Sequence, residues 1–214
     1  MAFEAKNIIV GAAPLFLSKK DSTDSTYATV LPEGAAVTAN TSIYDADTRE
    51  LKGATLSGAY ANVGYTNNGL QITYNPTYGS VTVDQLLDTA KLFKESMEVM
   101  LATEFTEATL ENVLRVFGQG ASTLSNDALG LEAGALGQEP TERQLIAVGL
   151  APRNTANKKR ERVYYARRVL SVQQSQFTLA RNNPTVFPVT FRLLPDAAYA
   201  GAEYGKIIDR VIEA

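Results

Sequence analysis

The feature that most constrains the fold is a strand-like alternation that passes directly into a helical pattern. In MEVMLATEF, every second residue from Met97 to Phe105 lies on one face, with Glu98 and Glu104 on the other. A period of two indicates a strand that buries one face. The following TEATLENVLRVFG repeats its apolar residues at helical spacing. The sequence therefore predicts a short helix packed against a sheet.

The helix is predicted over residues 106–118. Thr106 is the candidate N-cap, because its hydroxyl can accept a hydrogen bond from a free amide of the first turn. Gly118 can take the left-handed conformation that ends many helices. A helix of about three turns is not stable alone in water. We therefore expect its apolar stripe to seal one face of the β-core: Leu110, Val113, Leu114 and Phe117.

Further strand patterns place the chain in the mainly β class. IIVGAAPLFL, residues 8–17, predicts a buried strand, and residues 70–74 and 81–83 predict a hairpin whose loop is NPTYGS. In TVFPVTFRLL, Pro188 cannot donate a ladder hydrogen bond, which predicts an edge strand or a bulge. Other strands are predicted in RQLIAVGLAP, VYYARRVLSVQQSQFTLA and EYGKIIDRVI.

Two segments are predicted to be loops of one domain that spans residues 1–214. Residues 19–58 are rich in Ser, Thr, Asp, Ala and Gly, which predicts a long loop or an extended arm. Residues 119–138 are rich in Gly and Ala, which predicts an insertion in the form of a loop or flap. Loops of this length within compact domains usually serve a function or lack fixed structure.

Composition narrows the possible chemistry. The chain has no Cys and no His, which removes disulfides, thiolate metal ligands and the usual nucleophile–base pairs. Glu95, Glu98 and Glu104 do not form a close acid pair, since the last two would lie roughly 20 Å apart along a strand. We therefore expect no enzyme, no metal and no cofactor. A carboxylate-based glycan hydrolase is the enzymatic alternative, although the chain has no Trp to stack on sugars.

Charge is distributed unevenly along the chain. Residues 61–150 hold 11 Asp and Glu against 4 Lys and Arg, whereas residues 151–214 hold 5 against 11. An acidic middle and a basic end could pair between copies of the chain, or could simply interleave in the fold. The basic end includes a candidate interface patch, composed of Lys158, Lys159, Arg160 and Arg162. With Tyr164 and Tyr165 this patch could bind single-stranded nucleic acid, or could be a solvated turn that leads into a strand.

The ordered combination of these patterns resembles the tail tube (major tail) proteins of long-tailed bacteriophages. The stretch that carries the resemblance is GLQITYNPTYGSVTVDQLLDTAKLFKESMEVMLATEFTEATLENVLRVFG, residues 69–118. The opening AKNIIVGAAPLFLSK and the late VFPVTFRLLPD are also similar. The resemblance implies a β-sandwich or partly closed barrel with one flanking helix. It covers the chain in outline and about a quarter of it in detail.

The resemblance also implies a structural subunit of the virion, made in the bacterial host cytoplasm. Six copies would form a ring, and rings would stack into a tube through which DNA and tape-measure protein pass. Expected partners are other copies of the chain and the tape-measure, tail terminator and baseplate or tip proteins, with no membrane. The lumen tends to be acidic in this family, so Glu95, Glu98 and Glu104 are candidate lumen or interface residues. Residues 19–58 are the candidate contact between rings.

The extra length of the two loop segments leaves the tail type open between non-contractile, contractile and bacteriocin-type tubes. Other β-rich virion proteins, such as a tail terminator or a capsid decoration protein, are the alternative function. These would form a single ring or remain monomeric.

Overall fold

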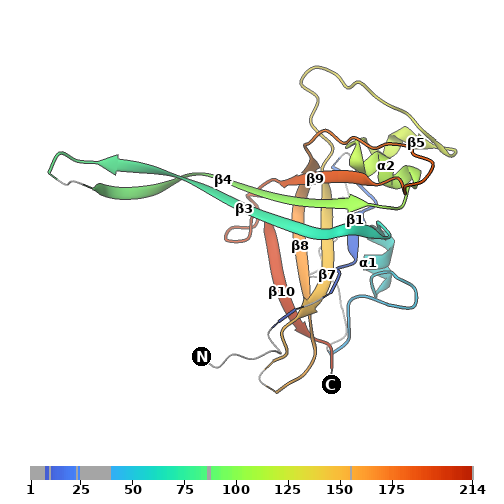
Figure 1. Cartoon of the computed structure of the whole chain (residues 1–214), viewed down its shortest axis with the longest axis horizontal. Helices are drawn as coiled ribbons and strands as arrows, with labels where there is room; N and C mark the ends of the chain where they lie inside the picture. Colours follow the sequence, from blue (N-terminus) through green and yellow to red (C-terminus); the bar gives the residue numbers. More distant parts are fainter. Residues whose placement is uncertain are drawn as a thin grey trace.

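The computed structural model describes residues 8–9, 11–22, 24, 40–85, 88–154 and 156–213. In this part the chain is mainly antiparallel β-structure, as predicted (Figure 1). Its elements, in chain order, are β1 (Leu15–Ser18), α1 (Ala54–Ala59), β2 (Tyr60–Asn62), β3 (Thr66–Thr82), β4 (Thr89–Phe105), α2 (Leu110–Val116), the 3-10 turn η3 (Ala121–Thr123), β5 (Leu124–Ser125), β6 (Ala128–Leu129), β7 (Arg143–Ala151), β8 (Arg160–Ser171), β9 (Phe187–Leu193) and β10 (Gly205–Val211).

One eight-stranded sheet forms most of the molecule. Its strands run in the order β2-β1-β7-β8-β9-β4-β3, and β10 pairs with β8 beside this path. The first part of β8, residues 160–166, pairs with β10, whereas residues 169–171 pair with β9. The sheet therefore divides along β8. Among the described residues, β2 and β3 each have one strand neighbour, so the sheet is not closed into a barrel.

The central strands β1 and β7 are buried on both faces, which explains their continuous apolar runs LFL and LIAV. Leu15, Leu17 and Leu145 face one hydrophobic cluster, together with side chains of β4, β9 and α2. Phe16 and Ile146 face a second cluster on the opposite side. The fold is thus layered, with apolar material packed on both sides of the central strands.

The alternation that predicted β4 is confirmed. Val99, Leu101, Thr103 and Phe105 are buried, and the residues between them are partly exposed. The strand is longer than predicted, because it starts at Thr89. The strands predicted in residues 143–151, 187–193 and 205–211 are also present. Sequence periodicity was therefore a reliable signal wherever one face of a strand packs on the core.

The predicted helix is present but shorter, and its cap is different. Thr109 is the N-cap, and its hydroxyl accepts a hydrogen bond from the amide of Asn112 at 3.3 Å. Thr106 instead donates to the carbonyl of Tyr65 at 2.8 Å. Gly118 has φ 66° and ends the helix in the left-handed conformation, as predicted.

Only part of the apolar stripe of the helix is buried against the core. Leu114 is buried and Val113 packs against the first cluster, but Leu110 and Phe117 are 40% and 37% exposed. The prediction that those two seal the core is therefore wrong.

A rotated helix face is buried instead: Asn112, Leu114, Arg115 and Val116. Asn112 can be buried because its amide donates to the carbonyls of Val63 and Glu107 and accepts from Arg115. Burial lowers the pKa of Arg115 to about 10. Buried polar residues on a helix are invisible to a search for apolar spacing, and this is why the predicted face was rotated.

The described C-terminal part of the predicted arm does not extend from the body. Ile43, Leu51 and Leu56 are buried in the second cluster, and α1 forms at the end of this segment. The carboxylate of the buried Glu161 fixes this segment by accepting from the hydroxyl of Ser42 and the amide of Ile43. Residues 23 and 25–39 of the predicted arm lie outside the described residues.

Two smaller expectations near the ends of the chain also need correction. The N-terminal strand begins only at Leu15, and Ile8 is exposed. Pro188 is not on an edge strand, because β9 lies between β8 and β4. The ladder to β8 covers only residues 191–193 of β9, so Pro188 lies beyond it and the missing N–H costs no hydrogen bond there.

The predicted insertion, residues 119–138, contains η3 and the small β5–β6 hairpin. The rest of the segment is irregular, and Leu131 and Leu136 are exposed in it.

Candidate functional site

The most distinctive feature of the molecule is the β3–β4 hairpin, which projects far beyond the body (Figure 1). Its ladder runs from the pair Thr66 and Phe105 at the root to Thr82 and Thr89 near the tip. β9 pairs with β4 only over residues 100–105. Among the described residues, β3 pairs only with β4 and residues 89–99 of β4 have no second strand neighbour. Both outer edges of the projection thus have backbone groups without a strand partner.

The prediction of a turn at NPTYGS is wrong, and it hid this hairpin. β3 runs without interruption through these residues, and the reversal comes after Thr82. Pro76 is tolerated because β3 is a terminal strand of the sheet. The register shifts between Thr77 and Tyr78, and this leaves Glu95 as the extra residue of a bulge in β4.

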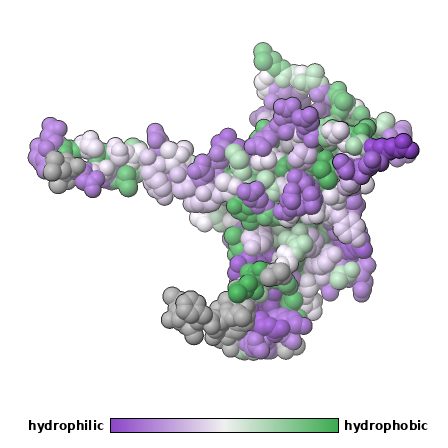
Figure 2. All heavy atoms as spheres, in the orientation of Figure 1, coloured by the Kyte–Doolittle hydropathy of each residue, from purple (hydrophilic) through white to green (hydrophobic). Residues whose placement is uncertain are grey.

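Large apolar and aromatic side chains are exposed along this projection, although part of its surface is polar (Figure 2). Tyr74, Tyr78 and Leu92 are 66%, 59% and 63% exposed. The others are Ile72, Val81, Val83 and Phe93. A two-stranded ribbon is marginally stable in water without a further strand or a covering layer. The hairpin therefore exposes apolar surface that no described part of its own chain covers.

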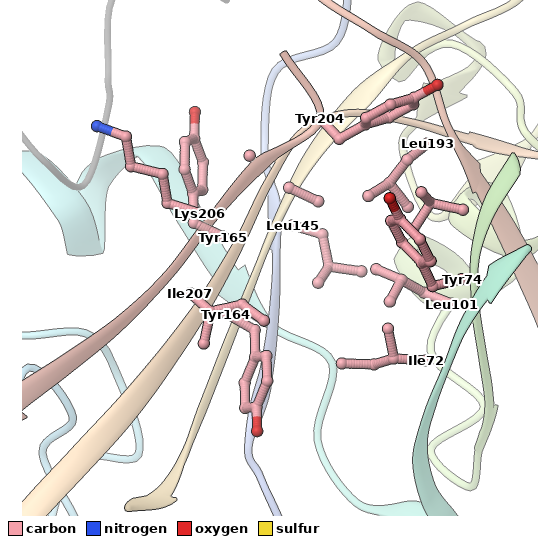
Figure 3. Close-up of a pocket in the computed structure, with 13 residues that line it drawn as sticks. Ile72, Tyr74, Leu101, Leu145, Tyr164, Tyr165, Leu193, Tyr204, Lys206 and Ile207 are labelled. Carbon is pink, nitrogen blue, oxygen red and sulfur yellow. The ribbon is translucent and has the colours of Figure 1, made fainter. Parts of the chain in front are cut away.

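A cleft of about 330 Å³ lies at the root of the hairpin. It forms where the sheet divides, between β10 on one side and the root of β3 and β4 on the other. Figure 3 shows Ile72 and Tyr74 of the hairpin on one side of this space, and Leu145 and Ile207 across from them. The hydroxyl of Tyr204 donates to the carbonyl of Met97 at 3.4 Å and holds the hairpin root near β10.

The lining of this cleft is mostly apolar. Its residues come from six strands and the turn before β10: Ile72, Tyr74, Val99, Leu101, Leu145, Tyr164, Tyr165, Ala166, Leu193, Tyr204, Gly205, Lys206 and Ile207. Ile207 is 65% exposed and Tyr74 is 66% exposed, so the mouth of the cleft presents apolar surface to solvent. Local sequence patterns do not indicate this site, because strands distant in sequence build it.

The three candidate acids all lie on β4, but not in one uniform environment. Glu95 is exposed at the bulge in the projecting part. Glu98 lies 3.7 Å from Arg192 of β9 in an ion pair. Glu104 accepts a hydrogen bond from the side-chain amide of Asn67 at 2.9 Å. They are spread along the strand and do not form one acidic cluster.

The candidate basic patch is divided between a loop and a strand. Lys158 and Lys159 lie in the loop before β8, whereas Arg160 and Arg162 lie in β8 itself. Both arginines pair with Asp209 of β10, at 3.5 Å and 2.6 Å. The charge of these two arginines is therefore compensated within the fold, and the role of the four residues as an interface patch stays a prediction.

Hydrogen bonds from these basic residues lower the pKa of the acids beside them. The side chain of Arg162 holds the pKa of Asp209 below its usual range, and the same bond raises the pKa of Arg162. The backbone amide of Lys159 lowers the pKa of Glu213. The interactions join β10 and the C-terminal residues to β8, which is a structural role.

In the part of the chain that the structure describes, no group of three or more acidic side chains is arranged to hold a metal ion. No helix among these residues has the length and hydropathy needed to cross a membrane.

No family model matches the chain, and no curated protein matches it in sequence. Solved structures do match, among them a crystal structure of Hcp protein, with 9% sequence identity, 94% of this chain and 99% of that chain covered, and a TM-score of 0.32. At that TM-score the likeness does not establish a shared fold or a shared function.

Proposed function

We propose that the chain is a structural subunit of a phage tail tube. Copies assemble as hexameric rings, and the rings stack into a hollow tube through which DNA passes. The observation that carries the proposal is the projecting β3–β4 hairpin, which exposes apolar side chains and two strand edges away from its own body. The sequence resemblance of residues 69–118 supplies the class of assembly.

Strand edges provide the physical basis for self-association. An unpaired edge can accept a strand from another chain through backbone hydrogen bonds. Exposed edges are a hazard in a monomer, and closure into a ring removes it. Among the described residues, β10 also pairs only with β8, so it offers a second edge on the other side of the cleft.

In this proposal the protein has no catalytic role and resides in the virion after synthesis in the host cytoplasm. The tape-measure, tail terminator and baseplate or tip proteins are its other partners, and DNA contacts it only in transit. A tail terminator or capsid decoration protein remains the second candidate, because the same exposed edges would serve a single ring or attachment to a shell.

Negative-stain electron microscopy with light scattering on the same sample tests the proposal. Purified wild-type protein is expected to give six-fold rings and tubes. The variant Leu92→Asp introduces a charge at a 63% exposed position of the hairpin, and it should remain folded but fail to assemble. Leu136→Asp, at a fully exposed loop position, is the matched control and should assemble as wild type does.

Single rings that never stack would favour the terminator. A strict monomer that binds only to shells would favour decoration. Assembly of Leu92→Asp into normal tubes would show that the hairpin does not mediate the contact.

A further inference from the structure

The apolar cleft at the hairpin root has no occupant within its own chain among the described residues. Residues 89–99 of β4 span roughly 35 Å at the rise of an antiparallel strand. The hairpin extends away from the body as a ribbon (Figure 1). Its tip therefore cannot fold back into the cleft at its own root without unpairing β3 from β4.

We propose that this cleft receives the tip of the β3–β4 hairpin from a second copy of the chain. The inference rests on the proposed self-assembly and specifies the two surfaces that meet. The donor surface is the tip, with Val81, Leu92 and Phe93. The acceptor surface is the cleft between β10 and the hairpin root, with Ile72, Tyr164 and Ile207 among its lining residues.

The two surfaces match in chemistry. The ladder places Leu92 opposite Ser80 and Phe93 opposite Gly79, so successive apolar side chains point to opposite faces of the ribbon. A ribbon with apolar groups on both faces suits a cleft with two apolar walls. One wall is the hairpin root and the other is β10 with Leu145 and Tyr164 (Figure 3).

The backbone of the cleft wall is also suited to this occupant. Among the described residues β10 pairs on one side only, with β8. The outer edges of the hairpin are open as well. A hairpin that enters beside β10 can therefore satisfy backbone groups of both copies while it covers their side chains.

Charge favours the same orientation. Asp84 and Asp88 lie at the turn of the hairpin, and Lys91 is set back along β4. Lys206 lines the cleft. Opposite charges at the leading end of the tip and at the cleft give a secondary contribution in favour of insertion tip first, because Lys206 also has an interaction within its own chain.

The size of the contact explains why many copies would be needed. A cleft of about 330 Å³ has room for only a few side chains of the tip, so most of the ribbon, roughly 35 Å long, stays outside it. The area that one insertion buries therefore remains below the roughly 800 Å² that each partner buries in a stable interface. A single insertion is thus a weak contact, and a closed ring in which each copy donates and accepts once would be stable through the sum of its contacts.

Cysteine cross-linking tests the proposal directly, because the chain has no Cys. Leu92→Cys places a thiol on the tip and Ile207→Cys places one at the cleft, and both native side chains are more than half exposed. The two single variants are mixed under conditions in which the wild type assembles, and are then oxidised. Any mixed disulfide must join two copies, and mass spectrometry of the cross-linked peptides identifies it.

The expected result is a disulfide between the tip and cleft positions. Because a bound interface raises the effective concentration of two thiols towards the mM range, its yield should exceed that of a Leu136→Cys control mixed with Ile207→Cys by about tenfold. Tubes that form without this cross-link, or with only tip-to-tip cross-links, would overturn the inference and leave the proposed function standing. Failure of the wild type to assemble under any condition would instead refute the proposed function.

Discussion

The ring of Phe93 lies directly over Gly79, its cross-strand partner in the projecting hairpin. A Cβ built on Gly79 would lie 2.5 Å from Cζ of Phe93. This close approach explains why a glycine is placed in the middle of a strand, where it is otherwise unfavourable. The ring covers backbone that no other strand protects, and so it stabilises the most exposed part of the molecule.

Gly79→Ala should therefore loosen the hairpin while the body stays intact. The added methyl displaces the Phe93 ring, at a cost of about 1 kcal/mol for overpacking. Hydrogen exchange should become faster in β3 and β4 and remain unchanged in β7 and β8. Gly58→Ala in α1 is the control, because nothing lies within 4 Å of its added Cβ. Equal protection of the hairpin in both variants would show that the ring contact is not stabilising.

Leu114→Asp should unfold the subunit. Leu114 is 4% exposed, and a carboxylate there would lose its hydration without gaining a partner, at a cost of roughly 3 kcal/mol or more. Leu110→Asp, on the same helix but 40% exposed, should change the free energy of unfolding by less than about 1 kcal/mol. Urea denaturation measures both. Similar midpoints for the two variants would mean that α2 does not seal the core.

Glu161→Ala should weaken the attachment of two segments to β8, the segment around Ser42 and Ile43 and the strand β10. Its buried carboxylate accepts from Ser42 and Ile43 and from the guanidinium of Arg210 on β10. Removal of the carboxylate leaves the partly buried guanidinium of Arg210 and the buried amide of Ile43 without this acceptor. The free energy of unfolding should therefore fall by about 3 kcal/mol.

Limited proteolysis should then detect cleavage within residues 40–52, and hydrogen exchange should increase in β10. Glu95→Ala, at the exposed bulge, serves as the control. Resistance of residues 40–52 to protease in Glu161→Ala would show that apolar packing alone holds that segment.

Acid should weaken the attachment of β10 to β8. The pKa of Asp209 is held below its usual range by the hydrogen bond from Arg162. A carboxylate with a depressed folded-state pKa stabilises the fold above its unfolded value of about 3.9, and the stability is lost as pH falls through the folded value. The difference in unfolding free energy between wild type and Asp209→Asn should thus be constant near neutral pH and shrink below about pH 4.

Chemical denaturation across this pH range measures that difference, with Asp47→Asn at an exposed loop position as the control. A difference that stays constant to pH 2 would refute the role of the ion pair.

The sequence by itself determined the mainly β class, the buried face of β4 and the end of α2. Each of these depends on local chemistry. Alternation from Met97 to Phe105 reflects one buried face, and Gly118 supplies a conformation that other residues take at a cost. The helix face was mispredicted because Asn112 is buried with a hydrogen bond to Val63, which a segment distant in sequence provides, and Arg115 is buried beside it with a bond to Asn112.

Only the tertiary structure decided the features on which assembly is proposed to depend. Turn-forming residues in NPTYGS are compatible with a strand when that strand lies at the end of a sheet, and sheet order is not a local property. The cleft exists because β8 pairs with β10 along one part and with β9 along another. Contacts between strands distant in sequence are set by the packing of the whole chain, so local periodicity could predict the strands but not the projecting hairpin or the cleft at its root.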